Sequence, residues 1–234
     1  MHHFSKLAVM SLAFAAAAVS ADPVVNPSSN SFGAQPGMCF GSPSCSISNA
    51  AVSYSQSASG GLTLGLTAHQ RYKNGMLWGS TVTNNGAGTF HTGPGGSPAF
   101  GGDTNPNNAG WNFAFAIIGA DVANYTYQLF ADFDAAAGST TFVDISPVLF
   151  QADSQLVAGT YQNSENLGFF TPAGDMFNPN SAGEYSFRLL ATSLTGGRTV
   201  TAEMLVEVPE PASLALVGIA LLGAVGISRR KSKK

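Results

Sequence analysis

Basic residues are scarce through most of this chain, and their scarcity excludes one large class of partner. Six of the ten Lys and Arg residues lie near the two ends, at Lys6 and within residues 229–234. Between Asp22 and Pro211, four basic residues accompany all thirteen acidic ones, which gives this segment a net charge of −9. A surface of this sign repels a phosphate backbone, so we expect no nucleic-acid partner.

Histidine and the common catalytic motifs are also scarce. Beyond the first residues only His69 and His91 remain, and the G-x-S-x-G, H-E-x-x-H and P-loop patterns are absent. We therefore expect no catalytic residues and no enzymatic activity, with His69 a solvated strand residue and His91 a loop residue. The thirteen acidic residues could still supply a carboxylate pair, which leaves a secreted glycoside hydrolase as an alternative.

The N-terminus lacks an apolar run long enough for a membrane span. The run from Leu7 to Val19 has 13 residues, fewer than the roughly 17–25 that a spanning helix needs. Lys6 precedes the run, and the small residues Ser20 and Ala21 follow it. This layout is typical of a secretory signal peptide over residues 1–21, so we expect export through the Sec machinery and a mature chain that begins at Asp22.

The chain has only two cysteines, Cys39 and Cys45. Export places both in an oxidising compartment, where thiols tend to pair. Gly41 and Pro43 lie between them and favour a tight turn, so we expect a local disulfide that pins the N-terminal segment. Two thiols are too few for a zinc site, and their spacing is not the C-x-x-C of redox pairs.

Residues 22–208 are poor in the charged residues of helical bundles and rich in Gly, Asn, Ser and Thr. Apolar and polar residues alternate with period two instead, which predicts strands with one buried and one wetter face. The alternating segments are 62–69, 125–134, 185–191 and 200–208. Residues 111–119 are apolar on both faces, which predicts a central strand covered on both sides.

Weaker strand candidates bring the expected total to about eight or nine. They lie at 51–57, 76–83, 141–150 and 155–161. Gly196-Gly197 predicts a tight hairpin between the last two strong strands, and Asn84-Asn85-Gly86 predicts a loop. The pattern predicts an all-β fold, a single antiparallel β-sandwich or jelly-roll-like domain over residues 22–208.

The C-terminus is apolar and then basic. After Val208 the chain reads PEPASLALVGIALLGAVGISRRKSKK, in which the apolar run Ala212 to Ile227 has 16 residues. We expect a helix over about 212–228, and the 16-residue apolar run would be roughly 24 Å long as a helix, which is marginal for a membrane span. The basic tail 229–234 predicts a cytoplasmic C-terminus, with residues 22–211 outside. The two prolines favour an extended Pro-Glu-Pro segment that stops the helix from growing upstream.

This C-terminal segment resembles a PEP-CTERM sorting signal, because a Pro-Glu-Pro triplet, an apolar helix and an Arg cluster follow one another over residues 209–234. The resemblance implies recognition of Pro209, Glu210, Pro211, Arg229 and Arg230 by exosortase, a membrane-embedded cysteine transpeptidase of bacteria that typically make exopolysaccharide. It also implies transient anchoring in the inner membrane, followed by delivery to the cell surface or extracellular matrix.

A broader resemblance covers the middle of the chain. GWNFAFAII, YTYQLFADFDAAAG, NLGFF and FNPNSAGEYSFRLLAT are similar to blocks of uncharacterised PEP-CTERM proteins. Ala135 stands where those blocks have proline, and Asn178 stands where they have aspartate. The resemblance implies a shared β-rich domain and brings no known activity.

Asp132 and Asp134 form a D-x-D pair at the end of a predicted strand. Period two places both carboxylates on one face, where they could bind calcium. The alternative is that both are ordinary turn residues, because Asp is favoured in turns. No other cofactor is expected.

Aromatic residues raise a second binding hypothesis, since Trp and Tyr rings stack on sugars. The candidates are Trp78, Trp111, Tyr125, Tyr127, Phe169 and Phe170. A sandwich of this size also needs aromatic residues for its core, and we expect core roles for most of them. The sequence therefore favours a structural or adhesive protein of the envelope or exopolysaccharide matrix, with a calcium-assisted carbohydrate-binding module as the alternative.

Overall fold

The computed structural model describes residues 25–41, 45–73, 76–94, 108–136, 138–139, 141–150, 155–157, 160–170 and 177–210. The expected signal peptide, Pro211, the helix at about 212–228 and the basic tail with Arg229 and Arg230 lie outside these residues. Among the residues that are described, no helix is long and apolar enough to cross a membrane. The domain boundaries 1–21, 22–208 and 209–234 therefore stay predictions.

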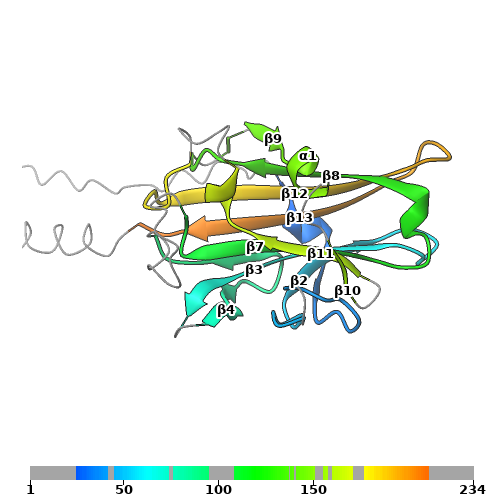
Figure 1. The fold of residues 1–234 in the computed structure, drawn as a ribbon. Helices are drawn as coiled ribbons and strands as arrows, with labels where there is room; N and C mark the ends of the chain where they lie inside the picture. Colours follow the sequence, from blue (N-terminus) through cyan, green and yellow to red (C-terminus); the bar gives the residue numbers. More distant parts are fainter. Residues whose placement is uncertain are drawn as a thin grey trace, which may run out of the picture.

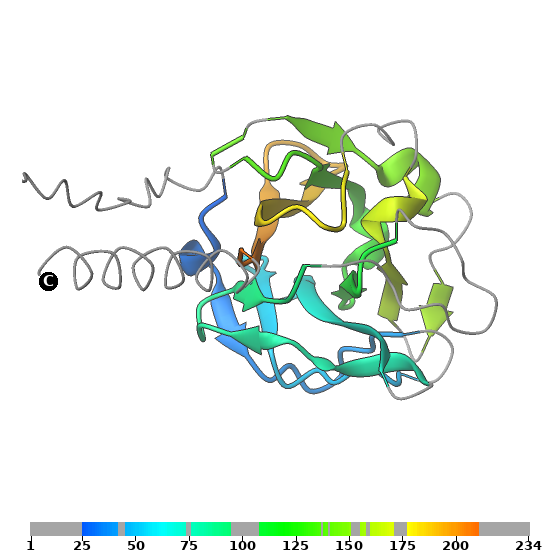
Figure 2. The ribbon, with the colours of Figure 1, turned by 90° about the vertical axis from the view of Figure 1, so that its left-hand side faces the viewer.

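Two β-sheets face each other as layers (Figure 1, Figure 2). The seven-stranded sheet contains, in order, β1 (Ser31–Gly33), β2 (Val52–Gln56), β3 (Thr63–Lys73), β7 (Trp111–Ile118), β11 (Thr160–Glu165) and β10 (Gln155–Val157), with β4 (Met76–Thr81) paired to β3. The six-stranded sheet contains β5 (Thr83–Asn84), β6 (Thr89–His91), β13 (Thr199–Val208), β12 (Gly183–Ser193), β8 (Tyr125–Asp132) and β9 (Phe142–Asp144). The prediction of an all-β fold is confirmed.

Pairing is antiparallel throughout the described strands except between β6 and β13, which run parallel. Short helical turns join the strands at η1 (Pro27–Ser29), η2 (Val122–Asn124), α1 (Ser146–Val148) and η4 (Leu167–Phe169). The described residues form thirteen strands rather than eight or nine. Most of the additional strands have only two or three residues, too few for an alternating pattern to be visible.

The core lies between the two sheets and follows the predicted alternation. The alternating apolar residues predicted for β12 and β13 are buried there: Tyr185, Phe187, Leu189 and Ala191, and Val200, Ala202, Met204, Val206 and Val208. Phe187 meets the opposite sheet at Phe113, with ring centroids 4.8 Å apart. Such aromatic pairs contribute about 0.5–1.5 kcal/mol beyond the area they bury.

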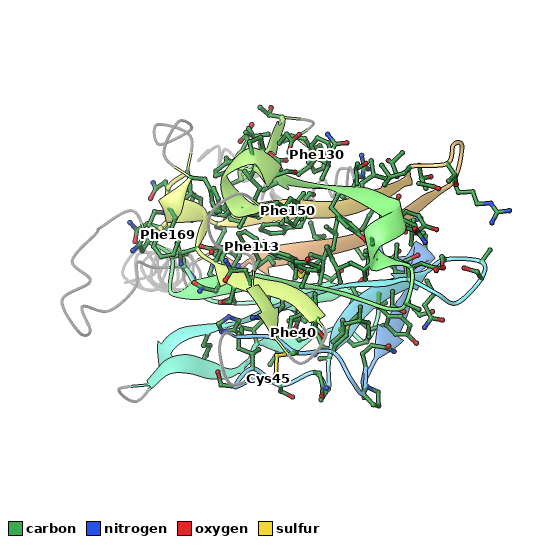
Figure 3. All side chains as sticks on the ribbon, turned by 45° about the vertical axis from the view of Figure 1, so that its right-hand side comes forward. Phe40, Cys45, Phe113, Phe130, Phe150 and Phe169 are labelled. Carbon is green, nitrogen blue, oxygen red and sulfur yellow. A yellow bond between two sulfur atoms is a disulfide. The ribbon has the colours of Figure 1, made fainter. Side chains whose placement is uncertain are left out.

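A smaller apolar cluster covers the outer face of the seven-stranded sheet. Ala114 and Ala116 of β7 pack there against Met38, Phe40 and Ile47 of the N-terminal segment. Figure 3 shows Phe113 and Phe150 between the layers, with Phe40 on the outer side beside Cys45. The prediction that the strand at 111–119 is covered on both sides is therefore confirmed.

One sequence prediction about β3 is wrong. The polar face of β3 is not wet, because Thr67 and His69 are both fully buried. Period-two alternation identifies which residues share a face, but it does not indicate that another segment covers the polar face.

Two further strand predictions need correction. The segment 141–150 is a strand only at β9, because Pro147 has no N–H to continue a ladder and occupies the first turn of α1. The segment predicted as one strand at 155–161 is divided between β10 and β11, which pair with each other. By contrast, the predicted hairpin at Gly196-Gly197 joins β12 to β13.

Candidate functional site: the end of the last strand

The sorting triplet follows the fold without a linker. Strand β13 ends at Val208, which is 3% exposed, and Pro209 and Glu210 follow it directly and are exposed. Val208 pairs with Gly183 of β12, so the last residue before the triplet is fixed in the six-stranded sheet. The change from buried strand to exposed segment therefore occurs within a single residue.

A cavity of about 450 Å³ lies at this strand end, and Pro209 and Glu210 form part of its lining. Glu184 and Glu207 face each other across β12 and β13 and also line it. Burial, and next the charge of Glu207, raise the pKa of the Glu184 carboxyl above its ordinary value. One carboxylate oxygen of Glu184 is buried and has no hydrogen-bond partner within the described part of the chain. The triplet thus begins beside an acidic site.

His91 provides a positive counterpart when it is protonated. Its Nδ1 lies 3.0 Å from Oε2 of Glu207, and both side chains are about two-fifths exposed. The prediction that His91 is a loop residue is wrong, because it is the last residue of β6 and lies opposite Glu207 in the parallel pair. Strand β6 is only three residues long, so its short sequence carried no strand signal.

The predicted disulfide between Cys39 and Cys45 is present, with Cα atoms 4.8 Å apart. It closes a small loop at residues 39–45, and Ile47, just after this loop, donates its N–H to the Phe40 carbonyl oxygen at 3.1 Å. Phe40 and Ile47 are buried on the outer face of β7. The bond therefore holds the N-terminal segment on the sheet.

Asp132 and Asp134 occupy successive turns at the end of β8. Asp132 Oδ1 accepts the Asp134 N–H at 3.0 Å, and Asp134 Oδ1 accepts the Ala136 N–H at 3.0 Å. Asp132 also accepts a hydrogen bond from the Ser139 hydroxyl and is 2% exposed. Burial raises the pKa of Asp132 above its ordinary value.

In these hydrogen bonds, the Asp132 and Asp134 carboxylates accept N–H groups of the turns that they occupy. Among the residues that the structure describes, no group of three or more His, Cys, Asp and Glu side chains could hold a metal ion. The turn-residue alternative accounts for the geometry of both aspartates. Calcium binding at Asp132 and Asp134 stays a prediction. The described residues provide no third His, Cys, Asp or Glu ligand beside the two aspartates.

The aromatic candidates divide between core and surface. Trp111 and Phe170 are buried, and the Tyr127 hydroxyl donates to the Val122 carbonyl oxygen at 2.7 Å while its ring packs on the core. Phe169 is 43% exposed, and Tyr125 is half-buried. The side chain of Trp78 lies outside the described residues. Core roles are confirmed for the three residues that are packed in this way.

A buried polar network connects β3, β7 and β11, and sequence reasoning missed it. His69 Nε2 lies 2.7 Å from Ser164 Oγ, and Asn112 Nδ2 donates to the same oxygen at 3.2 Å. Asn166 Nδ2 donates in turn to Asn112 Oδ1 at 2.9 Å. The expectation that His69 is solvated is wrong, because it is fully buried in this network.

The Ser164–His69 contact has the geometry of a serine with its general base. His69 is fully buried, however, and Ser164 is 7% exposed. With so little exposed surface, the pair acts in this structure as a cross-link between strands. The only sequence signal for it is that all four residues are polar and lie in strands or at strand ends.

Comparison with known proteins shows which family of motifs follows the end of β13. The family model of the PEP-CTERM protein-sorting motif matches residues 207–231. No curated protein and no solved structure matches the chain. The match begins at Glu207, within β13, and includes Pro209, Glu210, Pro211, Arg229 and Arg230, so it confirms the resemblance found in the sequence. The chain therefore carries a PEP-CTERM sorting motif, which implies export, a membrane-anchored C-terminal signal and processing by exosortase.

Proposed function

We propose that this protein is a non-enzymatic structural or adhesive component of the bacterial envelope or exopolysaccharide matrix, delivered by exosortase processing. The observation that carries the proposal is the direct junction between β13 and the Pro-Glu-Pro triplet of the sorting motif, at Val208 and Pro209. Cleavage beyond this junction leaves every pair of the β12–β13 ladder in place. The folded domain is then released intact at the outer surface.

The composition supports an extracellular role of this kind. The acidic segment has two sheets, a disulfide and few basic residues, which suits a soluble domain in an oxidising space. In this proposal the mature protein is retained by the matrix rather than by its helix. Exosortase and the Sec machinery act during delivery, the inner membrane holds the protein only transiently, and exopolysaccharide is the lasting partner.

The proposal is tested by replacing Pro209, Glu210 and Pro211 together with alanine in the producing bacterium. We expect wild-type protein in the surface and matrix fractions and the triple variant in the inner-membrane fraction. Thr195→Ala, on the exposed hairpin at the other end of β13, is the matched control and should fractionate as wild type. Equal amounts of wild type and triple variant in the matrix would contradict exosortase delivery.

The structural role needs a separate measurement. Cells that lack the protein should form a matrix with lower cohesion under shear, and wild-type protein should restore it. The triple variant should fail to restore cohesion, because it stays at the membrane. Unchanged cohesion in the deletion strain would contradict a structural or adhesive role and leave the delivery route standing.

A glycoside hydrolase is the remaining enzymatic alternative, and Glu184 and Glu207 are the pair on which it would rest. Glu184 and Glu207 lie directly opposite each other in the β12–β13 pairing, and the pKa of Glu184 is raised. A glycoside hydrolase needs a pair of carboxyl groups on either side of the scissile bond. We expect no reducing sugar from the producer's own polysaccharide. Release that Glu184→Gln abolishes would overturn the non-enzymatic proposal.

A further inference from the structure

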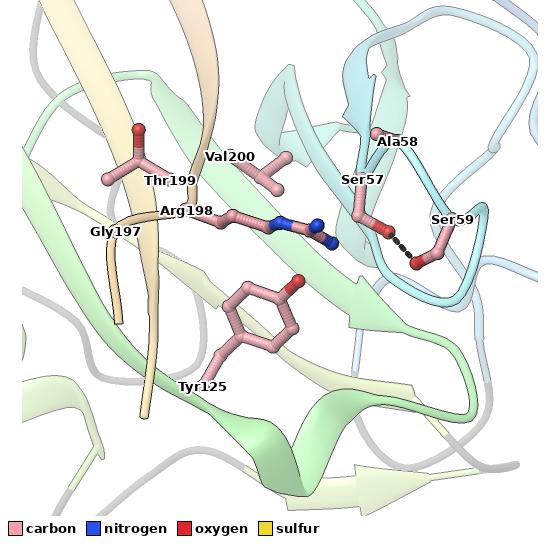
Figure 4. A pocket seen from close by; sticks show the side chains of 8 residues that line it. All are labelled: Ser57, Ala58, Ser59, Tyr125, Gly197, Arg198, Thr199 and Val200. Atoms are coloured by element: carbon pink, nitrogen blue, oxygen red, sulfur yellow. Dashed lines mark hydrogen bonds between the residues drawn. The ribbon is translucent and has the colours of Figure 1, made fainter. Parts of the chain in front are cut away.

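A second cavity lies at the end of the domain opposite the sorting motif. It has a volume of about 670 Å³ and is formed between the β12–β13 hairpin, the start of β8 and the turn that joins β2 to β3. Tyr125, Arg198 and the hydroxyls of Ser57 and Ser59 lie around it (Figure 4). Strand β13 has ten residues, so its two ends are about 30 Å apart at roughly 3.3 Å per residue.

Among the residues that the structure describes, Arg198 is the only charged one in the lining of this cavity. Its guanidinium makes no hydrogen bond, ion pair or ring contact with any residue that the structure describes. Arg188 is different, because its Nε lies 2.7 Å from Glu203 Oε1 and its guanidinium lies over the Phe142 ring. In an acidic domain, an arginine without an acidic partner is available to an anion from outside.

The other groups around the cavity suit a sugar. Figure 4 shows the Arg198 side chain extending from the hairpin above the Tyr125 ring toward the two serines. Tyr125 is half-buried, so its ring is supported by the core while part of it stays exposed. The Ser57 and Ser59 hydroxyls lie 3.2 Å apart and bond to each other. The serine hydroxyls can bond to the hydroxyl groups of a sugar, and the aromatic ring can contact the face of its pyranose ring. The guanidinium can pair with a carboxylate on the same sugar.

Asp121 is an acidic group beside the cavity, because its carboxylate contacts Ser59 of the lining. Its Oδ2 accepts a weak hydrogen bond from Ser59 at 3.4 Å, and a side chain added at Gly61 would clash with this carboxylate. Asp121 thus lies against the Gly61 backbone and is not part of the lining. Of these two charged residues, Arg198 lines the cavity and Asp121 does not.

We propose that this cavity binds a carboxylate-bearing sugar unit, such as a uronic acid, of an acidic polysaccharide. Arg198 pairs with the carboxylate, Tyr125 contacts the ring of the sugar, and the serine hydroxyls bond to its hydroxyl groups. This inference rests on the proposed function, because it names the chemical class of polysaccharide that retains the protein in the matrix. The position of the cavity, a full strand away from the sorting motif, keeps it open while the C-terminus is held at the membrane.

The test measures binding of tetragalacturonate to the full chain in detergent by isothermal titration calorimetry. Arg198→Gln should weaken binding at least about tenfold, because a charge-assisted hydrogen bond to the carboxylate is lost. Leu194→Glu is the matched control: it lies on the same hairpin, is 63% exposed, does not line the cavity and changes the net charge by the same amount. Its affinity should stay within about twofold of wild type, because exposed charges are screened.

Two further ligands test the chemistry of the site. Maltotetraose has the same number of sugar units without carboxylates, and a tetra-aspartate peptide has carboxylates without sugar rings. Neither should bind as tightly as tetragalacturonate. Equal binding of either ligand, absence of tetragalacturonate binding, or an Arg198→Gln variant with wild-type affinity would overturn the proposal. Because the assay uses unprocessed protein, its failure leaves the evidence for exosortase delivery unchanged.

Discussion

Ser164 connects three strands through a single oxygen atom. It contacts His69 of β3 and Asn112 of β7 from its own position in β11. Removal of the Ser164 hydroxyl takes one hydrogen-bond partner from His69 Nε2 and from Asn112 Nδ2. A buried polar group that loses its partner lowers the stability of the folded state. The residue thus matters more for stability than its size suggests.

We predict that Ser164→Ala lowers the free energy of unfolding by about 1–3 kcal/mol. The measurement is chemical denaturation at neutral pH. Ser59→Ala, at an exposed turn, is the control and should change stability by less than about 0.5 kcal/mol. A Ser164→Ala variant as stable as wild type would show that the network is not a cross-link.

Asp132 is the residue whose ionisation should couple most directly to folding. Its pKa is raised in the folded state, chiefly by burial, so the unfolded chain releases this proton at lower pH. Wild-type stability should therefore fall as pH rises from about 3.8 through the raised folded value, and Asp132→Asn lacks this contribution.

Denaturation of both proteins between acid and neutral pH checks the sign. The stability of wild type minus that of Asp132→Asn should decrease as pH rises and then level off. A difference that increases with pH would contradict the raised pKa. A calcium-dependent rise in the stability of wild type alone would support the calcium hypothesis for Asp132 and Asp134.

At the scale of elements, Gly119 illustrates how closely two strands approach. It follows β7 with a φ of +133°, and a side chain there would collide with the Gly61 carbonyl oxygen just before β3. Gly197 in the β12–β13 hairpin also has positive φ, but open space surrounds it. Substitutions at Gly119 and Gly197 therefore distinguish two costs: both positions impose backbone strain on a residue with a side chain, but only Gly119 adds a steric clash.

We expect Gly119→Ala to destabilise the protein by more than about 3 kcal/mol, because the backbone must move. Gly197→Ala should cost about 1–2 kcal/mol, the strain of positive φ alone. Thermal denaturation of the two variants measures the difference. Equal costs would mean that the Gly61–Gly119 contact is not tight.

The sequence predicts elements best where alternation is long and a turn sets the register. Once the hairpin is placed at Gly196-Gly197, the pairing of Thr192 with Thr199 leads directly to the pairing of Glu184 with Glu207. The acidic site beside the sorting motif could therefore have been found from sequence. The His91 contact could not, because it depends on a three-residue parallel strand.

The sequence also did not predict that another segment covers the outer face of the seven-stranded sheet. Met38, Phe40 and Ile47 pack on this face, and the short disulfide loop predicts the rigidity of their segment but not where it docks. Local pattern determines which residues share a face, while tertiary packing determines whether that face is dry. The same reason explains why the cavity around Arg198 escaped prediction.

At the scale of the whole molecule, the sorting motif and the proposed sugar site lie at opposite ends of the β domain. The motif end carries Pro209 and Glu210 beside Glu184, Glu207 and His91. The opposite end carries Arg198 and Tyr125. Strand β13 runs from one end to the other, so processing at one leaves the other unaltered.

The intact mass of the protein recovered from wild-type and exosortase-deleted cells tests this account most directly. The account predicts that wild-type cells yield a chain that begins at Asp22 and lacks the basic tail 229–234. Exosortase-deleted cells should yield a chain that begins at Asp22 and keeps the tail. An intact tail in both strains would contradict the central claim that the sorting motif is processed and the β domain released.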